Sequence, residues 1–237
     1  MAHDAILYLV SQPYLSARRL RALSDGLVAA SALPAKIARM EGVGIGPTTA
    51  LDALVADGYR AILVQPVGLP FSDSLAAWLP GALAHWLADQ DGVTLWLAGD
   101  QVDDTAVLAS VAQQTIANAD KARAVDVSKA ALDNPGWQDP PPFKHHVLVC
   151  AGPRCTFREA GSVKAALVDA LKAASVYDDC LIALTGCLYP CNQGPIVAVY
   201  PAGHWYRLET GNDVTQFAQG LANGAPVPQL IIHEVHS

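Results

Sequence analysis

Four of the five cysteines in this 237-residue chain lie in two close pairs. Four residues separate Cys150 from Cys155, three separate Cys187 from Cys191, and thirty-one lie between the pairs. Gly152 and Pro153 lie within the first pair, Pro190 lies within the second, and Gly194-Pro195 closes the second loop, so the backbone is able to turn tightly around a bound metal. Four thiolates brought together in this way suit either zinc or an iron–sulfur cluster.

The spacing of the two pairs distinguishes between the kinds of cysteine chemistry. Structural zinc sites usually use C-x2-C knuckles, and a thioredoxin-type dithiol needs C-x-x-C at the start of a helix. Neither spacing occurs here, and a reducing compartment disfavours disulfides. The pattern therefore favours an iron–sulfur cluster, with zinc as the alternative. The fifth cysteine, Cys180, lies in an apolar strand and is expected to face the core.

The elements that position the cysteines are predicted to be two strands, each of which ends at one pair. The apolar runs at 144–150 and 180–186 are these strands, and a helix at 161–174 connects them. An apolar segment, the turn P-A-G-H and an alternating segment then indicate a β-hairpin, followed by a helix at 213–223. The resulting order, β-α-β-β-β-α, is a thioredoxin-like layout.

This half of the chain resembles the thioredoxin-like [2Fe-2S] ferredoxins. The matching segments are VLVCAGPRCTFREAGS, TGCLYPCNQGP and VAVYPAGHWYRL. The resemblance implies a [2Fe-2S] cluster in which Cys150 and Cys155 ligate one iron while Cys187 and Cys191 ligate the other. It also implies one-electron transfer with a redox partner protein, and a homodimer. Tyr189 stands where a small residue is frequent in the family, which implies extra cover on the exposed side of the cluster.

The first half of the chain alternates apolar strands with helices. Strands are expected at 5–10, 60–67 and 93–98, and helices at 15–32, 48–57, 74–88 and 103–119. Such alternation predicts an α/β domain with a parallel sheet covered on both faces. The proline-rich segment DNPGWQDPPP cannot continue a helix or a central strand, so we expect a linker there. The predicted domains are 1–124 and 143–237, with the linker at 125–142.

Residues 5–120 resemble the small class-II chelatases of the CbiX and sirohydrochlorin type. The similarity lies in the initial strand and in the segment ALVADGYRAILVQPVGL. It implies insertion of cobalt, nickel or iron into a tetrapyrrole, with metal-binding histidines after two of the strands. This chain has SQPYLSAR and FSDSLAAW at those places, without histidine, and Asp73 alone is a weak metal ligand. The domain is therefore expected to be a degenerate, chelatase-like one that binds a tetrapyrrole or a partner, or that serves as a scaffold.

Charge and sequence pattern indicate which partners and which cellular compartment to expect. The formal net charge is −7, which argues against nucleic acid and anionic membranes as partners. The N-terminus lacks the pattern of a signal peptide, and no run of eighteen apolar residues predicts a membrane span. We therefore expect a cytoplasmic protein.

These observations predict a [2Fe-2S] one-electron carrier that serves a tetrapyrrole- or cobalamin-related pathway through its chelatase-like domain. No catalytic residue is predicted, and the pattern favours an electron-transfer protein over a catalyst. Two alternatives remain open. One is a cobalt or iron chelatase, a lyase, with remodelled metal ligands and an accessory cluster. The other is a tetrapyrrole-binding carrier.

Overall fold

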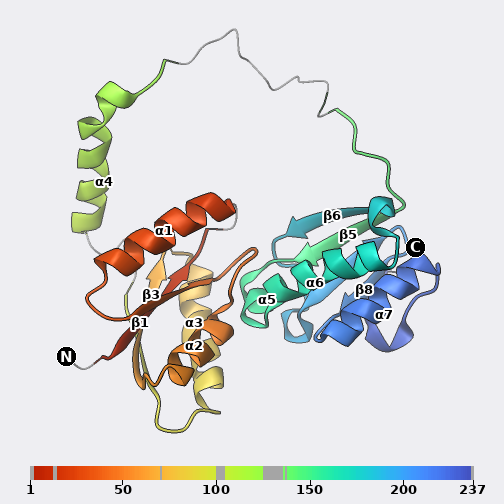
Figure 1. Cartoon of the computed structure of the whole chain (residues 1–237), viewed down its shortest axis with the longest axis horizontal. Coiled ribbons are helices and arrows are strands. Elements are labelled where there is room, and N and C mark those ends of the chain that lie inside the picture. The colour runs from red at the N-terminus through yellow and green to blue at the C-terminus, as the bar shows by residue number, and fades with distance from the viewer. Residues whose placement is uncertain are drawn as a thin grey trace.

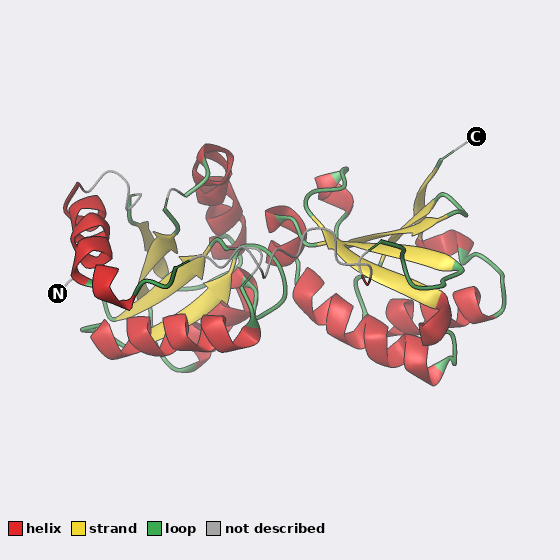
Figure 2. Cartoon of the chain, turned by 90° about the horizontal axis from the view of Figure 1, so that it is seen from above, coloured by secondary structure: helices red, strands yellow, loops and turns green. Residues whose placement is uncertain are grey.

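The chain forms two α/β units, each built on its own sheet (Figure 1). The computed structural model describes residues 3–12, 15–69, 71–99, 105–124, 136 and 138–235. Seen from above, the units lie side by side, and each sheet is flanked by helices (Figure 2). The α/β fold class predicted from the sequence is confirmed. Most of the predicted linker at 125–142 lies outside the described residues.

The first unit contains a sheet of four parallel strands in the order β2-β1-β3-β4. The strands are β1 (Ala5–Val10), β2 (Ala35–Arg39), β3 (Ala61–Val67) and β4 (Thr94–Leu97). Three of them were predicted. The strand β2 is not predicted, because Lys36 and Arg39 interrupt its short apolar pattern.

In the described residues, four helices accompany this parallel sheet. They are α1 (Ala17–Ala30), α2 (Pro47–Ala56), α3 (Asp73–Leu87) and α4 (Thr105–Ala117). The crossovers through α1 and α3 run in opposite directions along the sheet, so right-handed connections place these helices on opposite faces. α2 and α3 contribute buried residues such as Leu51 and Leu79, whereas α1 and α4 have no buried residue. Helices thus lie on both faces of the sheet, as predicted, but they bury their side chains unequally.

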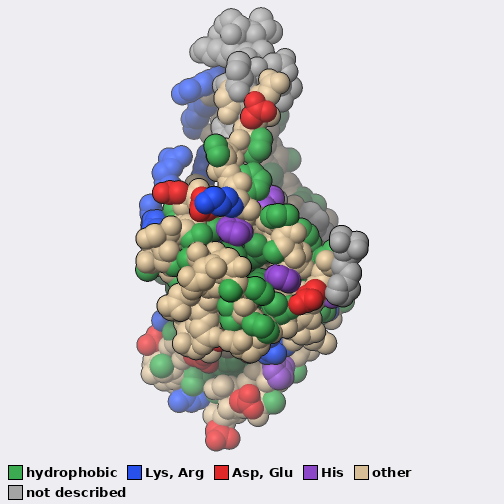
Figure 3. All heavy atoms as spheres, turned by 90° about the vertical axis from the view of Figure 1, so that its right-hand side faces the viewer, with side chains coloured by type: hydrophobic (Ala, Val, Ile, Leu, Met, Phe, Trp, Pro, Cys, Tyr) green, Lys and Arg blue, Asp and Glu red, His purple; other side chains and the backbone are tan. Residues whose placement is uncertain are grey.

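The second unit contains a mixed sheet in the order β6-β5-β7-β8-β9. Its strands are β5 (His145–Cys150), β6 (Cys180–Thr185), β7 (Ile196–Tyr200), β8 (His204–Arg207) and β9 (Ile231–Glu234). β5 and β6 are parallel, and the other neighbours are antiparallel, as the predicted hairpin requires. At this end of the molecule, hydrophobic side chains are interspersed with histidines and with charges of both signs (Figure 3).

Three helices complete the second unit, namely α5 (Pro153–Phe157), α6 (Ala160–Ala173) and α7 (Gly211–Ala222). Short 3-10 turns lie at Ala119–Lys121 in the first unit and at Tyr177–Asp179, Cys191–Gln193 and Pro228–Leu230 in the second. A capping box between Thr210 and Asp213 starts α7. α6 and α7 pack together over a core that includes Leu167 and Phe217. The structure adds α5 and β9 to the predicted order.

The carboxyl edge of the parallel sheet lies against the second unit. Phe157 of α5 packs into the core of the first unit, where its ring meets Trp78 edge-on. Thr48 Oγ1, in the first turn of α2, donates to the Phe157 carbonyl over 2.7 Å, and the Glu159 carboxylate accepts from the N–H of Thr49. An acidic group at a helix N-terminus interacts favourably with the helix dipole. Polar and apolar contacts therefore join the two units at one interface, which we call the seam.

The glycine-rich turn at 42–47 contributes to the same seam. The Gly42 N–H donates to the Ala151 carbonyl over 3.2 Å, and a Cβ on Gly161 would lie 2.7 Å from the Gly44 carbonyl oxygen. Buried Arg39 holds this turn by donating to the Val43 carbonyl. The turn thus serves as a contact between the units.

Candidate metal centre

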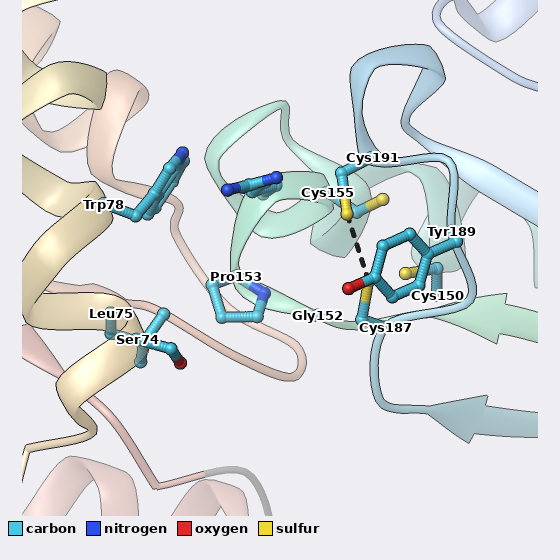
Figure 4. Close-up of a pocket in the computed structure, with 11 residues that line it drawn as sticks. Ser74, Leu75, Trp78, Cys150, Gly152, Pro153, Cys155, Cys187, Tyr189 and Cys191 are labelled. Atoms are coloured by element: carbon cyan, nitrogen blue, oxygen red, sulfur yellow. Dashed lines mark hydrogen bonds between the residues drawn. The ribbon is translucent and has the colours of Figure 1, made fainter.

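The four paired cysteines line a single cavity of about 200 Å³ (Figure 4). Cys150 ends β5, and Cys155 lies in α5, which begins three residues later. Cys187 follows β6, and Cys191 begins a 3-10 turn. Because β5 and β6 are parallel neighbours, the loops that leave their carboxyl ends meet. The structure therefore brings together all four cysteines that the sequence singles out.

The sulfur atoms are arranged as two pairs. The Sγ atoms of Cys187 and Cys191 lie 3.1 Å apart, whereas the Cys150 thiol donates to the Gly186 carbonyl over 3.4 Å and its pKa is influenced most strongly by Cys155. Within the described ranges, no three His, Cys, Asp or Glu side chains converge on one ion. All five cysteines are free of disulfides. Two metal ions, one per pair, fit this arrangement better than a single zinc, which needs four ligands around one point.

The thiols of the site differ in pKa. The hydrogen bond from Cys155 is the main cause that lowers the pKa of Cys150 to about 6, while burial opposes it. The same hydrogen bond, together with burial, raises the pKa of Cys155. Burial also raises the pKa of Cys187, as does its hydrogen bond with Cys191. Metal ions bound by the two pairs would override these differences, because coordinated thiols lose their protons.

Two glycines allow the cysteine loops to approach each other. A Cβ on Gly194 would lie 2.7 Å from Cys155 Sγ, and a Cβ on Gly152 would lie 3.0 Å from the Cα of Cys187. Backbone groups of Leu188 and Gly152 donate to Cys150. N–H donors to thiolate sulfur stabilise its negative charge and tune a cluster held there. The loops therefore form a close cradle for a charged centre.

The first unit covers one side of this cradle, which the sequence analysis did not predict. Figure 4 shows Ser74, Leu75 and Trp78 on α3 facing Pro153 and the cysteines. The missed residues carry no sequence signal beyond the helical pattern of α3, because their role depends on how the units dock. Tyr189 lines the cavity from the other side and is 71% exposed (Figure 4).

Comparison with known proteins identifies the family. A 2Fe-2S ferredoxin of Clostridium pasteurianum is 32% identical over 98 residues, a match that spans 38% of this chain and 96% of the ferredoxin. The chain belongs to the [2Fe-2S] ferredoxin family. A 2Fe-2S ferredoxin of Aquifex aeolicus is 33% identical over 100 residues and matched over 89% of its length. No protein-family model matches the chain.

Solved structures similar to parts of this ferredoxin include the following two. The thioredoxin-like [2Fe-2S] ferredoxin from Aquifex aeolicus shares 30% identity with a TM-score of 0.36, covering 40% of this chain and 96% of its own. A cobalamin (vitamin B12) biosynthesis CbiX protein from Marinobacter aquaeolei shares 19% identity with a TM-score of 0.42. That match covers 50% of this chain and 99% of the CbiX protein.

The remaining candidate residues of this ferredoxin lie away from the cysteine cavity. Asp73 is exposed in the first turn of α3 and is not among the residues that line the cavity. Cys180 is half-buried and packs against the core of the second unit, and burial raises its pKa to about 11. Among the described residues, no helix has both the length and the apolar character to cross a membrane.

Proposed function

We propose that this ferredoxin is a one-electron carrier whose [2Fe-2S] cluster is held by Cys150, Cys155, Cys187 and Cys191. The first pair ligates one iron and the second pair ligates the other. The observation that carries the proposal is the pairing itself, because two parallel strands deliver two cysteine pairs into one cavity. The family to which the chain belongs supports the same cofactor.

Residues around the cysteines stabilise negative charge at the site and exclude water from it. Bound there, a [2Fe-2S] cluster supplies one-electron oxidation and reduction. Backbone groups of Leu188 and Gly152 donate to Cys150 and so stabilise negative charge on its sulfur. Leu75, Trp78 and Pro153 line the cavity and keep water from the first cysteine pair, each member of which is 1% exposed.

The second cysteine pair marks the side on which electrons are exchanged. Cys187 is exposed and Cys191 is half-buried, in contrast to the buried first pair. A redox partner therefore comes nearest to the site beside Cys187, Cys191 and the exposed Tyr189. The homodimer remains a prediction. Light scattering tests it, because a dimer has twice the 24.9 kDa mass of one chain.

We further propose that the first unit directs the carrier to a tetrapyrrole- or cobalamin-related pathway. The resemblance of residues 5–120 to chelatases supports this role. In open α/β sheets, ligands bind at the carboxyl ends of the strands, and here that edge lies against the cysteine loops. A ligand at that edge would lie close to the cluster site. A spectral shift when sirohydrochlorin is added to the full chain would support the role, and an unchanged spectrum would count against it.

Metal and sulfide analysis tests the carrier proposal. Anaerobically purified protein is expected to be reddish-brown, with two irons and two sulfides per chain. Reduction with dithionite should bleach the visible bands and produce the electron paramagnetic resonance signal of a one-electron-reduced cluster. A colourless protein with one zinc per chain would overturn the proposal.

A further inference from the structure

A second cavity of about 180 Å³ lies directly beside the cysteine cavity, between α3 and the segment 154–158. We call it the basic cleft, and it is lined by Trp78, Gly81, Ala82, His85, Arg154, Phe157, Arg158, Cys191 and Asn192. Trp78, Arg154 and Cys191 also line the cysteine cavity, so the two cavities are contiguous. A molecule in the basic cleft would therefore lie against a predicted cluster ligand.

The charge of this cleft is opposite to that of the whole protein. Two guanidinium groups and an imidazole line it, no acidic side chain does, and the chain has a formal net charge of −7. In the described part of the chain, the ion pairs involve neither Arg154 nor Arg158. Such a local reversal of charge raises the local concentration of anions.

Neighbouring groups hold both arginines in place. The Arg154 guanidinium lies over the Trp78 ring, 5.6 Å from its centroid. Arg158 Nη1 donates to the Asn192 carbonyl over 3.0 Å, within the loop that carries Cys191. A guanidinium has five N–H donors, and the side-chain hydrogen bonds of Arg158 to other described residues use Nη1 alone. The remaining donors suit a carboxylate or phosphate group.

Charges around the far end of the cleft favour the same position for an anion. Beyond His85 and Arg158 the surface continues into a cavity of about 520 Å³, which Asp89, Glu159 and Glu209 also line. An anion is repelled from that acidic end and is attracted to the basic end beside Cys191. The groove is therefore polar along its length, with its basic end at the predicted redox centre.

We propose that the basic cleft binds a carboxylate group of a small metal–polycarboxylate complex, whose metal ion accepts one electron from this ferredoxin. The electron-transfer part rests on the proposed function, whereas the anion binding does not. One electron passes from the reduced centre to the bound acceptor, and no covalent bond forms or breaks. A small molecule suits the cleft because α3 and the segment 154–158 enclose it from two sides, and its volume holds one or two carboxylates.

Citrate binding to the full-length protein tests the site itself. Isothermal titration calorimetry should show one citrate per chain at low ionic strength, and the double variant R154Q/R158Q should bind at least tenfold more weakly. R21Q removes an exposed charge from α1 and should leave the affinity unchanged. Absence of citrate binding to the wild type would overturn the proposal, as would equal affinity in R154Q/R158Q. Binding of a polyglutamate peptide in place of citrate would also overturn it, in favour of a protein partner.

Oxidation kinetics of the reduced protein test the link to electron transfer. Stopped-flow rates are compared for an iron(III)–EDTA complex, which is a polycarboxylate, and for hexaamminecobalt(III), which is a cation. We expect R154Q/R158Q to slow oxidation by iron(III)–EDTA about five- to tenfold without slowing oxidation by the cobalt complex. Equal changes with both oxidants would indicate a general field effect and overturn the proposal. If the carrier function itself fails, neither oxidant reacts, while citrate still binds.

Discussion

The ring of Phe157 packs edge-on against Trp78, with centroids 5.6 Å apart and planes 83° apart. Phe157 lies two residues after Cys155 in the same short helix, whereas Trp78 belongs to α3 of the first unit. One aromatic contact therefore connects the cysteine loop to the core of the other half. Edge-to-face pairs of this kind add to the stabilisation from burial.

Replacing Phe157 by alanine should destabilise the protein by about 3 kcal/mol, because it removes a buried ring and leaves a cavity. Urea denaturation followed by circular dichroism measures this loss. F143A serves as the control, because Phe143 is 39% exposed and its loss should cost about 1 kcal/mol or less. Equal effects of the two substitutions would show that the Phe157 contact does not stabilise the fold.

Alanine at any of the four paired cysteines should lower the iron content to less than half of the wild-type value, because each substitution removes one thiolate ligand. Iron analysis and visible absorption of each purified variant provide the measurement. C180A should keep full colour, since Cys180 packs against the second core rather than in the cysteine cavity. A C180A variant as poor in iron as the others would contradict the proposed ligand set.

Gly194 should be intolerant of a side chain. Its Cβ would lie 2.7 Å from Cys155 Sγ, so G194A should displace the sulfur and shorten the lifetime of the bound cluster several-fold. G186A is a matched control in the same loop region, because nothing lies within 4 Å of the Cβ it would add. Decay of the visible bands in the presence of an iron chelator compares the two, and identical decay would refute the steric argument.

Stability should fall as pH rises above 9, in part because of Cys180. Burial raises its pKa from 9.0 to about 11, so the folded chain favours the neutral thiol. The contribution of this thiol to folding stability is fully present below pH 9. It is lost between pH 9 and 11, where the thiol ionises in the unfolded chain but stays neutral in the folded one. Melting temperatures of cluster-loaded protein across this range should fall less steeply for C180A than for the wild type. Parallel curves would show that Cys180 does not titrate in this way.

The sequence predicts the local part of this structure well. The strands that carry the cysteines are continuous apolar runs, and the paired spacing is visible without any coordinates. α5 escapes prediction because five residues between a glycine and an arginine carry no helical periodicity. β2 escapes because its apolar pattern is too short and contains two basic residues.

The docking of the two units is the part that the sequence does not predict. Trp78 and Arg154 come together only because α2, the turn at 42–47 and α5 fit one another across the seam. Such contacts depend on surface shape, which no periodicity in a single sequence encodes. For the same reason the basic cleft is not visible in the sequence, where His85 and Arg158 are far apart.

The unequal exposure of the two cysteine pairs has a consequence for how the protein matures in the cell. Cys150 and Cys155 are each 1% exposed, whereas Cys187 is open to solvent. If a delivered cluster reaches the folded chain, Cys187 and Cys191 are the ligands it meets first, with transfer to the inner pair as the second step. The alternative order, in which the inner pair binds first, requires the contacts at Phe157 between the two units to open before the cluster arrives.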